Sequence, residues 1–162
     1  MRQLAEIMEI FASNTVNNVD RKGRVSIPAS FRLALGGQSM LRGLVSVEHP
    51  VVEAGGEAMR QAYERRMEKL DPFSQAYEDW SHYVFGDALE LKLDGEGRIA
   101  INERLRQHTG IGDQVLFEGR GSSFWLWEPG RYEAYRAAAR ARVREMRRVL
   151  GSGDQPAKGR AT

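Results

Sequence analysis

The sequence contains no cysteine and only three histidines among its 162 residues. Without cysteine there can be no disulfide bond, thiolate metal ligand or cysteine nucleophile. His49, His82 and His108 form neither a metal-spaced pair nor a recognisable catalytic triad. The phosphate-loop pattern GxxxxGK(S/T) is absent too. We therefore predict a protein that is not an enzyme and that needs no metal or cofactor.

Long apolar runs are missing as well. No stretch approaches the roughly 20 residues of a membrane-spanning helix, and the N-terminus shows no signal-peptide pattern. Lack of cysteine is typical of reducing compartments. These features predict a soluble cytoplasmic protein with no membrane partner. Residues 1–10 are interpreted as a short extension, with Met8 as an alternative native start.

Charge is nearly balanced overall, at a formal net charge of +2, but it is unevenly distributed. Residues 1–130 carry 15 basic and 19 acidic side chains, a net charge of −4, whereas residues 131–162 carry 9 and 3, a net charge of +6. The overall field of such a body does not attract nucleic acid. DNA binding would therefore need a local basic patch.

Two stretches of the chain follow the same plan. They read "VDRKGRVSIPASFR" at 19–32 and "LDGEGRIAINERLR" at 93–106. Over the thirteen positions that start at Asp20 and at Asp94, five residues are identical at an offset of 74. The surrounding order of strand, turn, strand, short helix and hairpin also occurs twice, which indicates an internal duplication.

Hydrophobic periodicity and turn signals divide the chain into six segments. The segments are an extension (1–10), a first repeat (11–56), a helical connector (57–86), a second repeat (87–130), a basic C-terminal helix (131–150) and a disordered tail (151–162). Within the connector, the stripe of Tyr77, Trp80 and Tyr83 is interpreted as core packing. Gly151 is expected to end the last helix. The pattern predicts a mainly β protein with helices, in the α+β class.

The first turn carries the strongest functional signal. Arg21, Lys22 and Arg24 surround Gly23, and Gly23 and Gly97 supply the positive φ that tight hairpin turns need. A two-stranded ribbon can enter a major groove, where arginine bridges guanine O6 and N7 while lysine holds phosphate. The arginine-rich C-terminal helix could also touch phosphates or pair with acidic surface on a neighbouring subunit, but such charge runs are usually just solvated.

Each turn also pairs an acid with a base. Asp20 precedes Arg24 by four residues, and Asp94 precedes Arg98 by the same spacing. Each carboxylate could hold its guanidinium in a charge-assisted pair. The pairs could equally serve only to stabilise the hairpins, and spacing alone does not separate these two interpretations.

Three segments together resemble the MraZ family. They are "NNVDRKGRVSIPASFR", "GDALELKLDGEGRIAINERLRQHTGI" and "VLFEGRGSSFWLWEPGRYEAY", and the resemblance covers about Phe11 to Tyr135. MraZ proteins are bacterial regulators of the division and cell wall gene cluster, built from two SpoVT-AbrB-type repeats. The resemblance implies a swapped-hairpin β-barrel in which the two repeats of one chain interdigitate.

The resemblance also implies a function. The expected protein is a nucleoid-associated transcriptional repressor that forms a ring-shaped homo-oligomer, octamer or dodecamer, and binds repeated boxes in double-stranded promoter DNA. It implies no small-molecule substrate. The expected DNA contacts are Arg21, Lys22, Arg24 and, behind them, Arg98. The residues expected to support the turns are Asp20, Gly23, Asp94 and Gly97.

The chain departs from the family pattern in places, and two alternatives stay open. Ser13 stands where a glycine is expected, and the second turn has Gly95 and Glu96 in place of two cations, which predicts weaker DNA binding there. The first alternative is an antitoxin-like AbrB-type module whose main partner is a protein. The second is a structural ring-forming protein with incidental basic turns.

Overall fold

The computed structural model describes residues 10–154, so expectations for residues 1–9 and 155–162 lie outside it. The chain forms two units, Met1–Pro129 and Gly130–Thr162. The elements are β1 (Asn14–Asn18), β2 (Arg24–Ser26), α2 (Ala29–Leu35), β3 (Met40–Val45), β4 (Val52–Gly55), α3 (Glu57–Met67), α4 (Gln75–Ser81), the π-helical η1 (His82–Gly86), β5 (Leu89–Lys92), β6 (Arg98–Ala100), α5 (Glu103–Thr109), β7 (Gln114–Gly119), β8 (Phe124–Trp127) and α6 (Pro129–Asp154).

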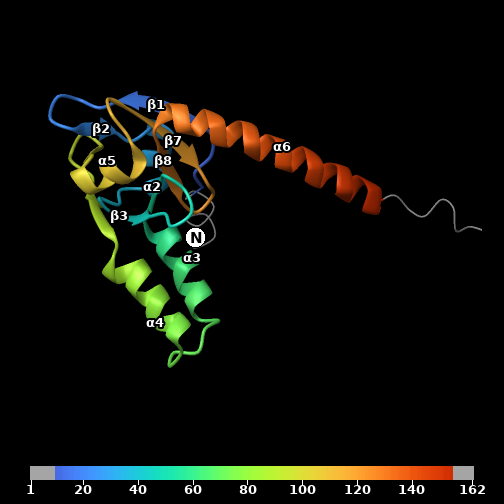
Figure 1. The fold of residues 1–162 in the computed structure, drawn as a ribbon. Coiled ribbons are helices and arrows are strands. Elements are labelled where there is room, and N and C mark those ends of the chain that lie inside the picture. Colours follow the sequence, from blue (N-terminus) through green and yellow to red (C-terminus); the bar gives the residue numbers. More distant parts are fainter. Residues whose placement is uncertain (1–9, 155–162) are drawn as a thin grey trace, which may run out of the picture. The chain divides into compact units, whose positions relative to one another are not determined.

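The two repeats exchange strands throughout (Figure 1). One antiparallel sheet has the order β1-β7-β8-β4-β3-β5, and a second sheet pairs β2 with β6. Every strand of one repeat therefore lies beside a strand of the other. The pairing is symmetric: Val16 faces Leu116 in β1–β7, and their counterparts at an offset of 74, Glu90 and Arg42, face each other in β5–β3. The expected α+β fold with interdigitated repeats is confirmed.

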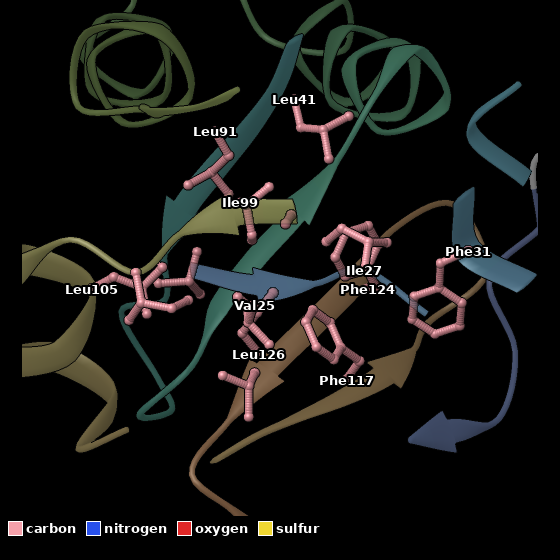
Figure 2. Close-up of a cluster of buried hydrophobic side chains, with 14 of the residues drawn as sticks. Val25, Ile27, Phe31, Leu41, Leu91, Ile99, Leu105, Phe117, Phe124 and Leu126 are labelled. Carbon is pink, nitrogen blue, oxygen red and sulfur yellow. The ribbon is translucent and has the colours of Figure 1, made fainter. Parts of the chain in front are cut away.

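The main core is built from both repeats together. Phe11 and Phe31 come from the first repeat, Phe117 and Phe124 from the second, and their ring centroids lie 5.0 to 6.5 Å apart. Figure 2 shows Val25 and Ile99 among the buried side chains of this cluster. Because the side chains of this core come from both repeats, one repeat alone would leave its half of the core exposed, which accounts for the unit occurring twice.

The connector forms a helical pair, α3 and α4, which lie side by side in Figure 1. Leu44, Met59, Met67 and other buried side chains form a second hydrophobic cluster, to which α3 contributes Met59 and Met67. Of the expected aromatic stripe, Tyr77 and Tyr83 pack half-buried against this cluster. Core packing is wrong for Trp80, which is 42% exposed. The short α4 has seven residues and none of them is buried, so the helical stripe alone does not place Trp80 in the core.

The basic helix runs further than expected. Gly151 was predicted to end it, but α6 continues to Asp154. A glycine costs a helix about 1 kcal/mol relative to alanine, yet it keeps the backbone N–H that proline lacks. Gly151 therefore weakens the helix without ending it.

Ser13 adopts the conformation that a glycine would favour. Its φ is +72°, the only positive φ of a non-glycine residue between residues 10 and 154. The Ser13 carbonyl accepts a hydrogen bond from the N–H of Gly119 at 2.8 Å, which holds the backbone there.

Replacing Ser13 with glycine should stabilise the protein. Left-handed backbone costs an L-residue about 1–2 kcal/mol, part of which is offset by the greater entropy of glycine in the unfolded chain. We expect Ser13→Gly to raise the free energy of unfolding by about 0.5–1 kcal/mol, measured by urea denaturation. Ser13→Ala retains the strain and should bring no gain. An equal gain in both variants would contradict the strain.

Candidate nucleic-acid interface

The first turn is organised by one carboxylate. Asp20 Oδ1 accepts hydrogen bonds from the backbone N–H groups of Lys22 and Arg24, both at 2.9 Å. Asp20 Oδ2 accepts from Arg24 Nε at 3.0 Å, and the Asp20 carbonyl accepts from the N–H of Gly23 at 3.0 Å. Gly23 has a φ of +78°, the conformation that its glycine predicted. The carboxylate thus fixes both the turn and its arginine.

The second turn repeats this geometry closely. Asp94 Oδ1 accepts from the N–H groups of Glu96 and Arg98 at 2.9 Å each, and Asp94 Oδ2 accepts from Arg98 Nε at 2.9 Å. Gly97 also has a φ of +78°. Both predicted Asp–Arg pairs are therefore formed.

Strand pairing joins the two turns through one ribbon. Val25 of β2 faces Ile99 of β6, and both side chains point into the core at 1% exposure. Because side chains alternate along a strand, Arg24 and Arg98 lie on the outer face of the ribbon. Only small side chains, those of Ser26 and Ala100, share that face. The result is a short antiparallel ribbon that carries one guanidinium near each end.

The glycines also take part in this pairing. The carbonyl of Gly97 accepts from the N–H of Ile27 at 2.9 Å, and the carbonyl of Gly23 accepts from the N–H of Ile101 at 2.7 Å. Each turn is therefore hydrogen-bonded to the strand end of the opposite repeat. The turns and the ribbon are therefore joined in one hydrogen-bonded unit.

The two turns differ in the number of cationic side chains that have no ion-pair partner among the described residues. Arg21 and Lys22 are exposed, and neither side chain makes an ion pair or hydrogen bond with any residue in the described part of the chain. The second turn offers no counterpart to these cations. Arg98 Nη1 instead lies 3.4 Å from Glu96 Oε2 and 3.9 Å from Asp20 Oδ2, in addition to its bond to Asp94. The available positive charge therefore gathers at the first turn.

Arg24 and Arg98 also differ in how exposed their side chains are. The Arg24 side chain is 32% exposed and faces one carboxylate, whereas the Arg98 side chain is 22% exposed and faces three. The carboxylates raise the pKa of Arg98 further, with the Asp94 hydrogen bond as the main cause. An anion would meet less competition at Arg24 than at Arg98.

Arg32 braces the second turn, a role that sequence reasoning had not assigned, whereas the equivalent Arg106 binds the loop that follows α5. Arg32 of α2 lies against the second turn, where a Cβ added to Gly97 would be 2.4 Å from Arg32 Cδ. Its equivalent, Arg106 of α5, donates to the carbonyls of Ile111 and Gly112 at 3.3 and 2.8 Å. The signal was present, because these arginines are the last identical pair of the repeat alignment.

The carboxylates of Asp20 and Asp94 make the stability of the folded protein depend on pH. Hydrogen bonds from the backbone N–H groups, chiefly that of Arg24, lower the pKa of Asp20, and the equivalent bonds from Arg98 lower the pKa of Asp94. A carboxyl whose pKa is lower in the folded state stabilises folding above its unfolded pKa, near 3.8. That contribution is lost as the pH falls through the folded pKa.

We expect acid to destabilise the wild type more than an Asp20→Asn, Asp94→Asn double variant. Asparagine keeps the oxygen that accepts the backbone N–H bonds but does not titrate in this range. Urea unfolding at about pH 5 and about pH 3 measures the difference. Both side chains are exposed, so added salt should shrink it. Identical pH dependence in the two proteins would contradict the role of these carboxylates.

Neither a metal cluster nor a membrane-spanning helix is found among the described residues. Between residues 10 and 154, no three histidine, aspartate or glutamate side chains gather closely enough to hold a metal ion. No helix in this range has the length and apolarity needed to cross a membrane. The turns and their ribbon remain the candidate site.

This architecture defines a duplicated α+β domain in which the two repeats exchange strands. In each repeat, an aspartate carboxylate accepts the backbone hydrogen bonds of a tight turn.

A family model described as "MraZ protein, putative antitoxin-like" matches residues 84–149. Three similar proteins are each named transcriptional regulator MraZ. The one from Azorhizobium caulinodans is 40% identical over 148 residues, with 90% of this chain and 94% of that protein covered.

The other two relatives show the same extent of similarity. The protein from Rickettsia bellii is 38% identical over 147 residues, covering 88% of this chain and 97% of its own. That from Xanthobacter autotrophicus is 40% identical over 147 residues, covering 90% and 94%. The chain belongs to the MraZ family.

Proposed function

We propose that this protein is a DNA-binding transcriptional repressor whose first turn contacts double-stranded promoter DNA. The main support for this proposal is the first turn. Arg21 and Lys22 lie exposed there and have no partner among the described residues, and they flank an arginine, Arg24, that Asp20 holds in place. The relatives' name, transcriptional regulator, supports a role at promoters. Gene targets in the division and cell wall cluster, and association with the nucleoid, belong to the same proposal.

The proposed DNA contacts are of two kinds, one to bases and one to phosphates. Arg24 is held in place by Asp20, and an oriented guanidinium suits bidentate binding to guanine in a major groove. Arg21 and Lys22 project freely, which suits contacts to phosphate. Arg98 would contribute less because three carboxylates compete for it. Asp20, Gly23, Asp94 and Gly97 would act by shaping the turns.

A ring-shaped homo-oligomer is part of the proposal. One turn with three cations would bind DNA weakly, but several turns on a rigid ring could engage several repeated boxes at once. The second contact is then intramolecular, so avidity rises without any new chemistry. Native mass spectrometry tests this part: a single closed species, octamer or dodecamer, supports the ring, and a monomer contradicts it.

A reporter gene tests the repressor function in cells. The reporter is placed behind the DNA that precedes this protein's own gene, and either the wild type or Arg24→Ala is produced in trans. We expect the wild type to lower reporter output and the variant to leave it unchanged. Equal output with and without the wild type would contradict repression.

The family model's description favours one second candidate, an antitoxin-like module. Such a module would act mainly by binding a protein partner rather than promoter DNA. Affinity purification of the chain from its native host separates the two. A stoichiometric protein partner together with no selective DNA binding would favour the antitoxin-like function.

A further inference from the structure

A pocket away from the basic turns has the features of a small-molecule site. It has a volume of about 310 Å³ and lies between the β3–β4 loop, α3, α4 with η1, and the β7–β8 hairpin. None of its lining residues belongs to either turn or to the β2–β6 ribbon. Small-molecule sites usually start at roughly this size and combine aromatic walls with a few polar groups.

Three aromatic rings form one side of the pocket. The Tyr63 hydroxyl donates to the Glu53 carboxylate, and the Tyr83 hydroxyl donates to the Val45 carbonyl at 3.0 Å. Both hydroxyls are thereby committed to the protein, and both rings are fixed. The Trp80 ring lies 6.3 Å from that of Tyr63 and 5.8 Å from that of Tyr83, yet 42% of Trp80 is exposed. An indole held this way offers a flat face to a ligand.

Two guanidinium groups lie on the aromatic walls. Arg66 lies over the Tyr63 ring, with Cζ 4.8 Å from the centroid, and Arg120 lies over the Trp125 ring at 3.9 Å. Stacking holds a guanidinium by its face and leaves its N–H edge open to other groups. At Arg120 that edge is engaged, because Nη1 lies 3.6 Å from Glu118 Oε1. No carboxylate in the described range lies within ion-pair distance of Arg66. The pocket therefore has an available anion-binding group beside aromatic walls.

The acidic residues of the pocket limit which ligand fits. Glu53 is engaged at both oxygens, by the hydroxyls of Tyr63 and Ser123, so it acts as a structural group. Glu48 is exposed at the rim. With two arginines and two glutamates, the lining is formally neutral, so its net field does not attract a bare anion. A ligand would need an aromatic ring as well as a negative charge.

We propose that this pocket binds an aromatic organic anion of the size of a nucleoside monophosphate. The ring would stack on the exposed indole of Trp80, and the anion would bind the N–H edge of Arg66. The proposal goes beyond the repressor function and does not depend on it, because the pocket and the turns share no residue.

Tryptophan fluorescence tests the proposal without DNA. Two of the three tryptophans, Trp80 and Trp125, line the pocket, so a bound ring should change their emission. The full chain is titrated with AMP, GMP, CMP and UMP in turn, with free N-acetyltryptophanamide as the correction for absorbance. At least one should give saturable quenching with a Kd below about 1 mM. Adenosine and inorganic phosphate, which each lack one feature, should bind at least about tenfold more weakly.

A matched pair of arginine variants tests the location. Arg66→Ala should weaken binding at least about tenfold, whereas Arg65→Ala removes an exposed neighbour outside the pocket and should leave it unchanged. Circular dichroism of both variants checks that they fold. No saturable response to any of the four monophosphates, or an equal loss in both variants, overturns the proposal. Failure of promoter binding would not affect this result.

Discussion

We expect Arg24→Ala to abolish selective binding to promoter DNA and to leave the fold intact. A bidentate arginine–guanine contact is worth about 1–3 kcal/mol, and a ring that uses two or more turns loses that amount at each of them. We therefore expect affinity for the operator to fall at least about 100-fold. The fold should persist because the backbone N–H bonds to Asp20 Oδ1 do not involve the arginine side chain. Fluorescence anisotropy with labelled operator DNA measures the loss.

Two other arginine variants make this result specific. Arg98→Ala should lose no more than about tenfold, because its guanidinium is already engaged by carboxylates. Arg65→Ala removes the same charge from an exposed position on α3 and should change affinity little. If all three variants lose affinity equally, net charge rather than the first turn governs binding.

Phe124→Ala should cost about 3–5 kcal/mol of the free energy of unfolding. Phe124 is 0% exposed, and its ring contacts Phe11 and Phe31 of the first repeat as well as Phe117 of its own. The truncation leaves a cavity at the point where the repeats interlock. Because domains of this size are stable by only about 5–15 kcal/mol, the variant should be marginally folded.

Phe73 provides the matched control for this substitution. It is 96% exposed in the loop between α3 and α4, so Phe73→Ala should change stability by less than about 0.5 kcal/mol. Urea unfolding followed by fluorescence and by circular dichroism measures both variants. A single coincident transition supports one core shared by the repeats. Two separate transitions, or a small loss for Phe124→Ala, would contradict it.

Local features of the site were predictable from the sequence. The Asp–Arg pairs form within five residues, and the glycines at 23 and 97 have the positive φ that their turns require. The two short helices, α2 and α5, end at glycines, Gly36 and Gly110, both of which have left-handed backbone. Such features depend on a few neighbouring residues, so spacing and residue type suffice to predict them.

Features that join distant segments could not be derived from spacing. Val16 faces Leu116, one hundred positions away, and only the family resemblance implied that the repeats interlock. The pocket is lined by residues from four segments between Ser46 and Trp125, so no local sequence pattern could predict it. The exposure of Trp80 likewise depends on how α4 packs, since its helical stripe alone suggested core.

The most direct test of the repressor account is the binding of the wild-type protein to the DNA upstream of its own gene. Anisotropy is measured over a series of salt concentrations, with a scrambled duplex as the control. The account predicts that the upstream DNA binds at least about 1,000-fold more tightly than the scrambled duplex. Each phosphate contact adds about −0.9 to the slope of log K against log salt, so two engaged turns with two contacts each give a slope of about −4. Equal, weak binding to both duplexes would contradict the account.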